Sequence, residues 1–145
     1  MGTQQLILII LSVIMLGSMT IVTMNIIKSS SRRTNINCMI GEMQIFSSQV
    51  MQYYKTPLRQ SGGGLEISTE KDSLIASFIK FDTDNDGDDK AYSTEYGEYQ
   101  LEVFDGFITI VGIGNEIGND GINPINITLT VTPANSNPND IVINN

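Results

Sequence analysis

The 145-residue sequence contains no histidine, no tryptophan and a single cysteine, Cys38. Without histidine the chain cannot supply a histidine general base or a Cys–His nucleophile, and zinc sites of mixed Cys and His ligands are excluded as well. One cysteine cannot form an intramolecular disulfide, so an exported fold needs stability from packing, calcium or neighbouring copies. We therefore expect a protein that is not an enzyme. We interpret Cys38 as a small apolar residue buried on a helix.

Positive charge is also scarce, and it is unevenly distributed. The chain carries 8 Lys and Arg against 16 Asp and Glu, for a formal net charge of −8. Residues 1–60 include Glu42 as their only acid and five basic residues, which are Lys28, Arg32, Arg33, Lys55 and Arg59. The remainder is strongly acidic, and an acidic surface repels phosphates. We therefore expect no nucleic-acid partner.

A long uncharged apolar stretch lies close to the start of the chain. It runs from Leu6 to Ile27 without one charged residue. As a helix it would be roughly 33 Å long, which matches the ~30 Å hydrocarbon core of a bilayer. Three interpretations compete: a cleaved signal peptide, a permanent anchor, and a helix that packs against copies of itself. The first fits poorly, because MGTQQ has no basic side chain and the apolar core is too long.

A helical pattern continues beyond this stretch. Apolar residues recur at the spacing of one helical face, at Ile36, Met39, Ile40, Met43, Phe46, Val50 and Tyr53 or Tyr54. No proline occurs before Pro57, so both parts can form one helix of about fifty residues. Pro57 and the glycines at 62–64 then end it. We expect an apolar helix at 1–29, an amphipathic stem at 30–56 and a head at 57–145.

The head is expected to be a small antiparallel sheet. Residues 73–81 fit a short helix or a strand equally well. Asp105-Gly106 is typical of a two-residue hairpin turn. Counting across that turn gives one apolar side of the ribbon, with the pairs Phe104–Phe107, Val103–Ile108 and Leu101–Ile110.

After a glycine-rich loop at 112–121, residues 125–131 alternate apolar and polar side chains and are predicted to form a third strand. Residues 139–145 are a candidate fourth strand. The apolar face of the helix at 36–54 is the one segment long enough to cover the sheet. The fold class is therefore expected to be α+β, with a long N-terminal helix packed on a small antiparallel sheet.

An acidic segment, FDTDNDGDDK, precedes these strands. Aspartates alternate along residues 82–88, and Gly87 stands where an EF-hand loop turns sharply. The twelfth position is Ser93 rather than Glu, and Glu95 is the nearest replacement in a longer loop spanning 82–95. We predict that one Ca²⁺ is held by five carboxylates, those of Asp82, Asp84, Asp86, Asp88 and Glu95. The alternative is a solvated acidic loop.

The order of these elements resembles the type IV pilin superfamily. The stretches MGTQQLILII, QYYKTP and SGGG are also similar to those of uncharacterised bacterial pilin-like proteins. The resemblance implies an inner-membrane precursor that assembles with itself into a filament at the cell surface. The filament core would then include Leu6, Ile7, Leu11, Ile14, Leu16 and Ile21. Family members usually carry Glu four positions after the first mature residue, and this chain, counted from Met1, has Gln5.

Two other functions stay open at this stage. One is a single-span membrane protein with a small calcium-dependent binding head, and the other is a pseudopilin of a secretion machine. The basic residues at 28–33 directly follow the apolar stretch, and the positive-inside rule would hold that end in the cytoplasm, whereas a pilin head faces outward.

Asn126-Ile127-Thr128 is a glycosylation sequon, and strand alternation places Asn126 on the polar face.

Overall fold

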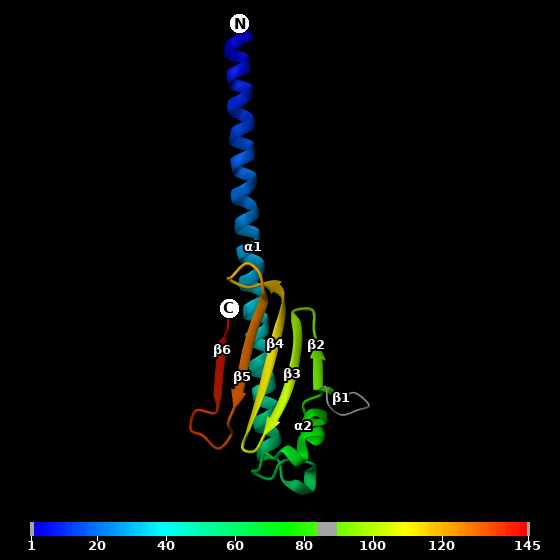
Figure 1. Ribbon diagram of the computed structural model, residues 1–145. Coiled ribbons are helices and arrows are strands. Elements are labelled where there is room, and N and C mark those ends of the chain that lie inside the picture. The colour runs from blue at the N-terminus through cyan, green and yellow to red at the C-terminus, as the bar shows by residue number, and fades with distance from the viewer. Residues whose placement is uncertain (1, 84–89, 145) are drawn as a thin grey trace. The chain divides into compact units, whose positions relative to one another are not determined.

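The computed structural model describes residues 2–83 and 90–144 and has an α+β, pilin-like architecture (Figure 1). A long N-terminal helix, α1 (Gly2–Lys55), is followed by a short helix and an antiparallel sheet. Contacts between residues divide the chain into two compact units, Met1–Thr34 and Asn35–Asn145, and α1 contributes to both. Residues 84–89 of the predicted calcium loop lie outside the described residues.

The end of α1 falls at Lys55, as the following proline predicts. The glycine-rich segment then folds back over this end. The N–H groups of Gly63 and Leu65 donate to the carbonyls of Tyr53 and Tyr54, each over 2.8 Å. These bonds satisfy carbonyls that a helix end leaves without intrahelical partners. The glycine-rich segment therefore caps the helix.

The second unit contains a six-stranded antiparallel sheet in the order β1-β2-β3-β4-β5-β6. The strands are β1 (Asp82–Thr83), β2 (Lys90–Ser93), β3 (Gly97–Phe104), β4 (Phe107–Ile117), β5 (Pro124–Val131) and β6 (Asn139–Ile143). Helix α2 (Asp72–Phe78) precedes them, and 3₁₀ turns lie at Leu58–Gln60 and Thr69–Lys71. The segment at 73–81 that fitted either structure is therefore mostly helical. Strands β5 and β6 were expected from the sequence, whereas β1 and β2 were not.

The β3–β4 hairpin has the predicted register, with the three expected pairs formed and Gly106 at a φ of 91°. One expectation about it is wrong. Phe104 and Phe107 were placed on the same apolar side as Val103, but successive side chains of a strand point to opposite faces. The two phenylalanine rings therefore stack on the other face, with centroids 4.7 Å apart, and Phe104 is 40% exposed.

Strand β4 extends to Ile117, so the prediction of a loop over 112–121 is wrong for residues 112–117. Gly114 faces α1, where a Cβ atom would lie 2.6 Å from Asn35 Oδ1 and 2.8 Å from the sulfur of Met39. The missing side chain thus lets the helix approach the strand closely. Between Ile113 and Ile117 the pairing with β5 shifts register.

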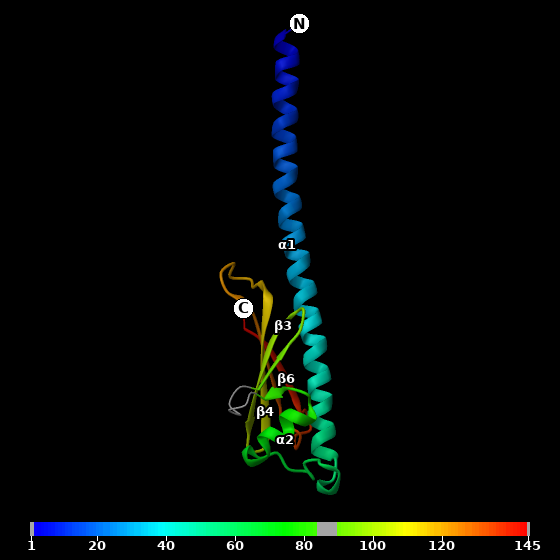
Figure 2. The same cartoon turned by 90° about the vertical axis from the view of Figure 1, so that its right-hand side faces the viewer.

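The core of the second unit lies between α1 and one face of the sheet (Figure 2). The helix contributes the residues that its periodicity predicts: Met39, Met43, Phe46, Val50 and Tyr53 are at most 5% exposed. The sheet contributes the inward side chains of β3, β4 and β5, in a strict alternation along β3. Each such large apolar side chain stabilises the fold by about 1.5–3 kcal/mol. No described helix covers the opposite face of the sheet. Along β3 and β5, the side chains on that face alternate with the buried ones and are mostly polar.

Candidate functional site

The structure describes only part of the predicted calcium site. Asp82 lies in β1 opposite Ala91, and Thr83 lies opposite Lys90. Asp84, Asp86 and Asp88 fall outside the described residues. Within residues 2–83 and 90–144, no group of three or more His, Cys, Asp or Glu side chains is placed to hold a metal ion. The calcium site stays a prediction from the sequence.

Glu95, the fifth predicted ligand, follows the far end of β2. The strand runs from Lys90 to Ser93, a span of roughly 10 Å. Glu95 is exposed, and a hydrogen bond with its side chain raises the pKa of Tyr96 to about 12. The structure therefore does not bring Glu95 beside the Thr83–Lys90 pair.

An ion pair fixes the start of β2 to α2. The Lys90 ammonium contacts the Asp72 carboxylate, and the Lys90 side chain is only 10% exposed. This contact holds β2 against the helix that precedes the sheet. It thereby anchors the strand that directly follows the acidic segment.

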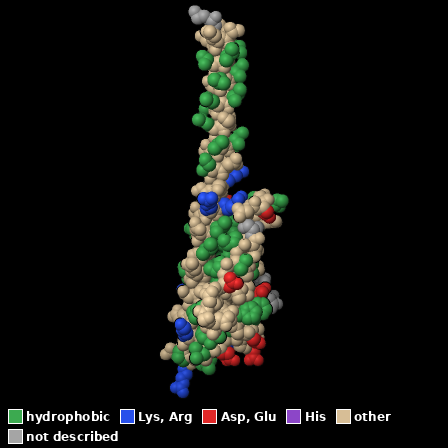
Figure 3. Space-filling view, turned by 90° about the vertical axis from the view of Figure 1, so that its left-hand side faces the viewer, with side chains coloured by type: hydrophobic (Ala, Val, Ile, Leu, Met, Phe, Trp, Pro, Cys, Tyr) green, Lys and Arg blue, Asp and Glu red, His purple; other side chains and the backbone are tan. Residues whose placement is uncertain are grey.

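The predicted filament-core residues lie on α1 in the first unit, and all are exposed. Their exposed fractions range from 55% for Leu11 to 65% for Leu16. In the described part of the chain, α1 is the one helix whose length and composition suffice to cross a membrane. No residue in the most apolar 18-residue stretch of α1 is buried. Hydrophobic side chains line this segment, with basic side chains at its C-terminal end (Figure 3). The segment is thus a continuous uncovered apolar surface.

The hydroxyl groups of this segment are satisfied by α1 itself. Each donates to a backbone carbonyl three or four positions earlier over 2.7–2.9 Å, in Ser12, Ser18, Thr20 and Thr23. An unpaired hydroxyl is costly in an apolar environment. Because these hydroxyl donors are paired within the helix, they need no further partners when lipid or apolar side chains surround the segment.

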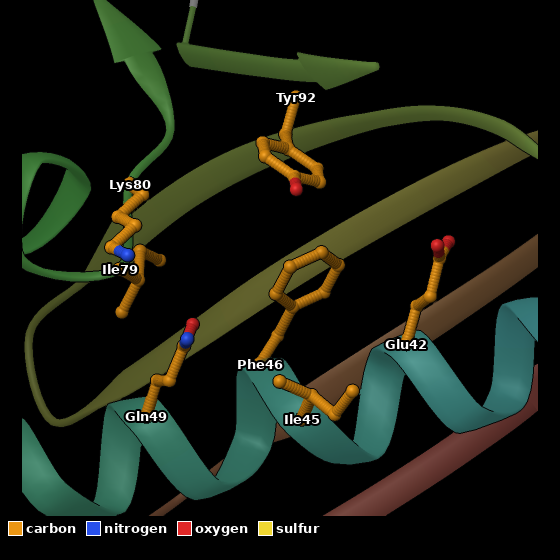
Figure 4. Close-up of a pocket in the computed structure, with 7 residues that line it drawn as sticks. All are labelled: Glu42, Ile45, Phe46, Gln49, Ile79, Lys80 and Tyr92. Carbon is orange, nitrogen blue, oxygen red and sulfur yellow. The ribbon is translucent and has the colours of Figure 1, made fainter. Parts of the chain in front are cut away.

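A hollow of about 230 Å³ lies in the second unit between α1, β2 and the end of α2 (Figure 4). Glu42, Phe46 and Gln49 project towards it from α1, and Tyr92 projects from β2. The rings of Phe46 and Tyr92 meet edge to face, with centroids 5.6 Å apart. Ile45, which is 57% exposed, forms part of the wall.

Glu42 is the residue of this hollow that sequence reasoning missed. Its Oε2 accepts hydrogen bonds from the Tyr99 hydroxyl and, over 3.1 Å, from the Thr94 hydroxyl. Burial and the bond to Glu42 raise the pKa of Tyr99 above its ordinary value. The available signal was its position as the only acid in α1.

Gln49 leaves an acceptor unused at the same hollow. Its Oε1 atom is buried and has no hydrogen-bond partner among the described residues. Lys80 stands at the rim, exposed, with a left-handed φ of 64°. A carboxylate, an amide oxygen without a partner and the exposed ring of Tyr92 are groups that attract a cation.

Two further sequence candidates lie elsewhere. Asn126 is half-buried on the polar face of β5, where its Oδ1 accepts a 3.1 Å hydrogen bond from Asn144. Cys38 is half-buried on α1 and forms no disulfide. The structure therefore brings neither residue into the hollow or onto the apolar segment.

A scan against models of known protein families, a search of curated proteins and a search of solved structures each find no match to this chain. The function therefore has to be inferred from the surfaces described above.

Proposed function

We propose that this protein is a structural subunit of an extracellular helical filament similar to a type IV pilus, assembled through residues 6–27 of α1. The observation that supports this most directly is the exposure of that segment, whose large apolar side chains are all at least 50% exposed. Contiguous apolar surface of this extent requires lipid or protein around it. A precursor held in the membrane and a polymer of the same chain each provide that cover in turn.

The composition of the segment favours contact between helices over a lone anchor. An anchor needs only compatibility with lipid. Gly17, Ser18 and Thr20 are small, and a Cβ atom built on Gly17 has no neighbour within 4 Å, so another helix has room to approach closely. The absence of charge means that no buried ion must be matched when copies stack.

The continuation of α1 supports assembly as well. Beyond the apolar stretch the helix runs on to Lys55 and buries one face on the sheet, while Ile45 remains 57% exposed on its surface. A simple anchor has no need for such a continuous helix. In a filament the same helix would tie each head to the core.

A charge inside the apolar segment provides the test. We expect Leu11→Lys or Ile14→Lys to abolish fibres, because an unpaired ammonium would be buried between copies. The control is Gln52→Lys, which adds the same charge at an exposed position of α1. Membrane fractions should contain all variants, and the near-ultraviolet circular dichroism of their tyrosines should match the wild type, so that loss of fibres reports assembly.

Electron microscopy of each variant then decides. Fibres of normal abundance from Leu11→Lys would show that the segment is not their core. Wild-type protein that stays monomeric and never forms fibres would instead favour the single-span anchor with a binding head.

A further inference from the structure

We propose that the hollow beside Glu42 receives the side chain of Lys28 or Arg33 from a second copy of this chain. The inference rests on the proposed filament and names one of its contacts. It joins an acceptor-rich hollow on the second unit with two exposed basic side chains at the end of the apolar helix, those of Lys28 and Arg33.

The chemistry of the hollow fits an ammonium or guanidinium group. Gln49 Oε1 is buried without a partner, which is costly unless a donor arrives. Glu42 supplies negative charge, and its carboxylate is held in place by the hydroxyls of Tyr99 and Thr94. The ring of Tyr92, which is 38% exposed, adds a surface on which a cation is stabilised.

The shape of the hollow fits the stem of a long basic side chain. The volume of about 230 Å³ exceeds what a single water requires, and the exposed Ile45 forms an apolar wall beside the polar groups. Lysine and arginine pack their methylene groups along such apolar surface while the charged end reaches acceptors. An acidic or short polar side chain would leave either the wall or Gln49 Oε1 unused.

Among residues 2–83 and 90–144, no side chain fills the hollow. Lys80 lines its rim but is exposed, and in the part of the chain that the structure describes it forms no ion pair. The Lys71–Glu66 and Lys90–Asp72 ion pairs do not involve Glu42. The acceptors of the hollow therefore remain available to another copy.

Charge complementarity identifies the partner as a second copy. Residues 28–33 contain three basic residues and no acid, whereas residues 35–145 contain all sixteen acids and only five basic residues. Lys28 and Arg33 are exposed. Stacked acidic heads repel one another, and a basic segment placed against a neighbouring head offsets that repulsion. Because residues 28–33 directly follow the apolar segment, packing of that segment between copies carries them along.

Cross-linking between copies tests the contact directly. In a Cys38→Ala background, full-length Gln49→Cys protein is mixed with full-length Arg33→Cys or Lys28→Cys protein before assembly and then oxidised. We expect a mixed disulfide dimer on a non-reducing gel with at least one of the two partners. The control is Gln44→Cys, which is exposed on the same helix outside the hollow and should give much less of this dimer.

Charge insertion provides the second measurement. Gln49→Lys should reduce fibre yield about tenfold or more, because it places a like charge where the basic side chain enters. Gln44→Lys should assemble normally. Normal fibres from Gln49→Lys together with no mixed dimer would overturn the contact and leave the filament intact. Wild-type protein that forms no fibres would overturn the filament and this contact with it.

Discussion

Glu42 shows how a single charged residue is accommodated next to the core. Its carboxylate is half-buried on α1, and the hydroxyls of Tyr99 and Thr94 donate to it. Tyr99 is fully buried, and its ring lies against Gly112, where a Cβ atom would come within 2.8 Å of it. The glycine therefore makes room for the ring whose hydroxyl holds Glu42.

Because the pKa of Tyr99 is raised, we predict that the free energy of unfolding falls at alkaline pH. Burial and the hydrogen bond to Glu42 raise its pKa above the unfolded value of about 10. A raised pKa stabilises the folded state below pH ~10, and that contribution is lost as the pH rises further towards the folded pKa. Urea unfolding of the full chain in detergent, followed by tyrosine circular dichroism, should show the free energy of unfolding falling above pH ~10.

Tyr99→Phe provides the matched variant. It removes the donor to Glu42 and should cost about 1–3 kcal/mol at neutral pH. It should also flatten the alkaline decline without abolishing it, because burial raises the pKa of Tyr53 too. If the free energy of unfolding of Tyr99→Phe fell as steeply with pH as that of the wild type, Tyr99 would not be the cause of the alkaline decline.

The acidic loop predicts a calcium response. We expect the full chain to bind one Ca²⁺ with a dissociation constant on the order of 10⁻⁴ to 10⁻³ M, as extracellular calcium modules do. Millimolar calcium should then raise the melting temperature, and Asp82→Ala with Asp84→Ala should remove the shift. Asp140→Ala, an exposed acid in β6, is the control. An unchanged melting temperature in the wild type would leave only a solvated acidic loop.

At the scale of elements, the β3–β4 turn offers the sharpest test of the fold. Gly106 has a φ of 91°, and its N–H donates to the carbonyl of Ile67 over 3.0 Å, which docks the turn on the preceding segment. Gly106→Val should destabilise the second unit by more than ~1 kcal/mol, since a β-branched residue is strained at positive φ. Gly106→Asn should cost less, because Asn tolerates this region. Equal melting temperatures for both variants would contradict this turn geometry.

The alternation of apolar and polar residues in the sequence predicted those strands that bury one face and expose the other. β3 and β5 follow this pattern along their length, so both strands could be predicted, and the Asp105-Gly106 turn gave the register of β3 against β4. β2 is mostly exposed and lies towards one edge of the sheet, so its sequence carries no alternation to detect. The end of β4 was predicted as a loop because glycine usually marks loops, and only the close approach of α1 explains Gly112 and Gly114 in a strand.

The hollow could not be predicted for a related reason. Its lining comes from α1, the segment after α2, and β2, which meet only once the sheet has formed. The apolar segment, by contrast, is local in sequence and was predictable from composition alone. Surfaces made by one helix can thus be read from the chain, whereas those made by several elements require the fold.

At the scale of the whole molecule, charge and apolar surface are kept apart along the chain. The uncharged apolar segment comes first, a short basic segment follows, and the acidic sheet comes last. In the proposed polymer, an uncharged segment would avoid the cost of burying ions between copies, and acidic heads would favour solubility of the outer surface. This order suits a polymer with an apolar core and a polar exterior.

Electron microscopy of the full-length wild-type protein after slow removal of detergent tests the central claim most directly. The account predicts helical fibres in which a maleimide probe fails to label Ile14→Cys, in a Cys38→Ala background, although it labels the same variant in detergent. Particles that stay monomeric, or fibres in which this cysteine is labelled as fast as in detergent, would contradict a core built from residues 6–27.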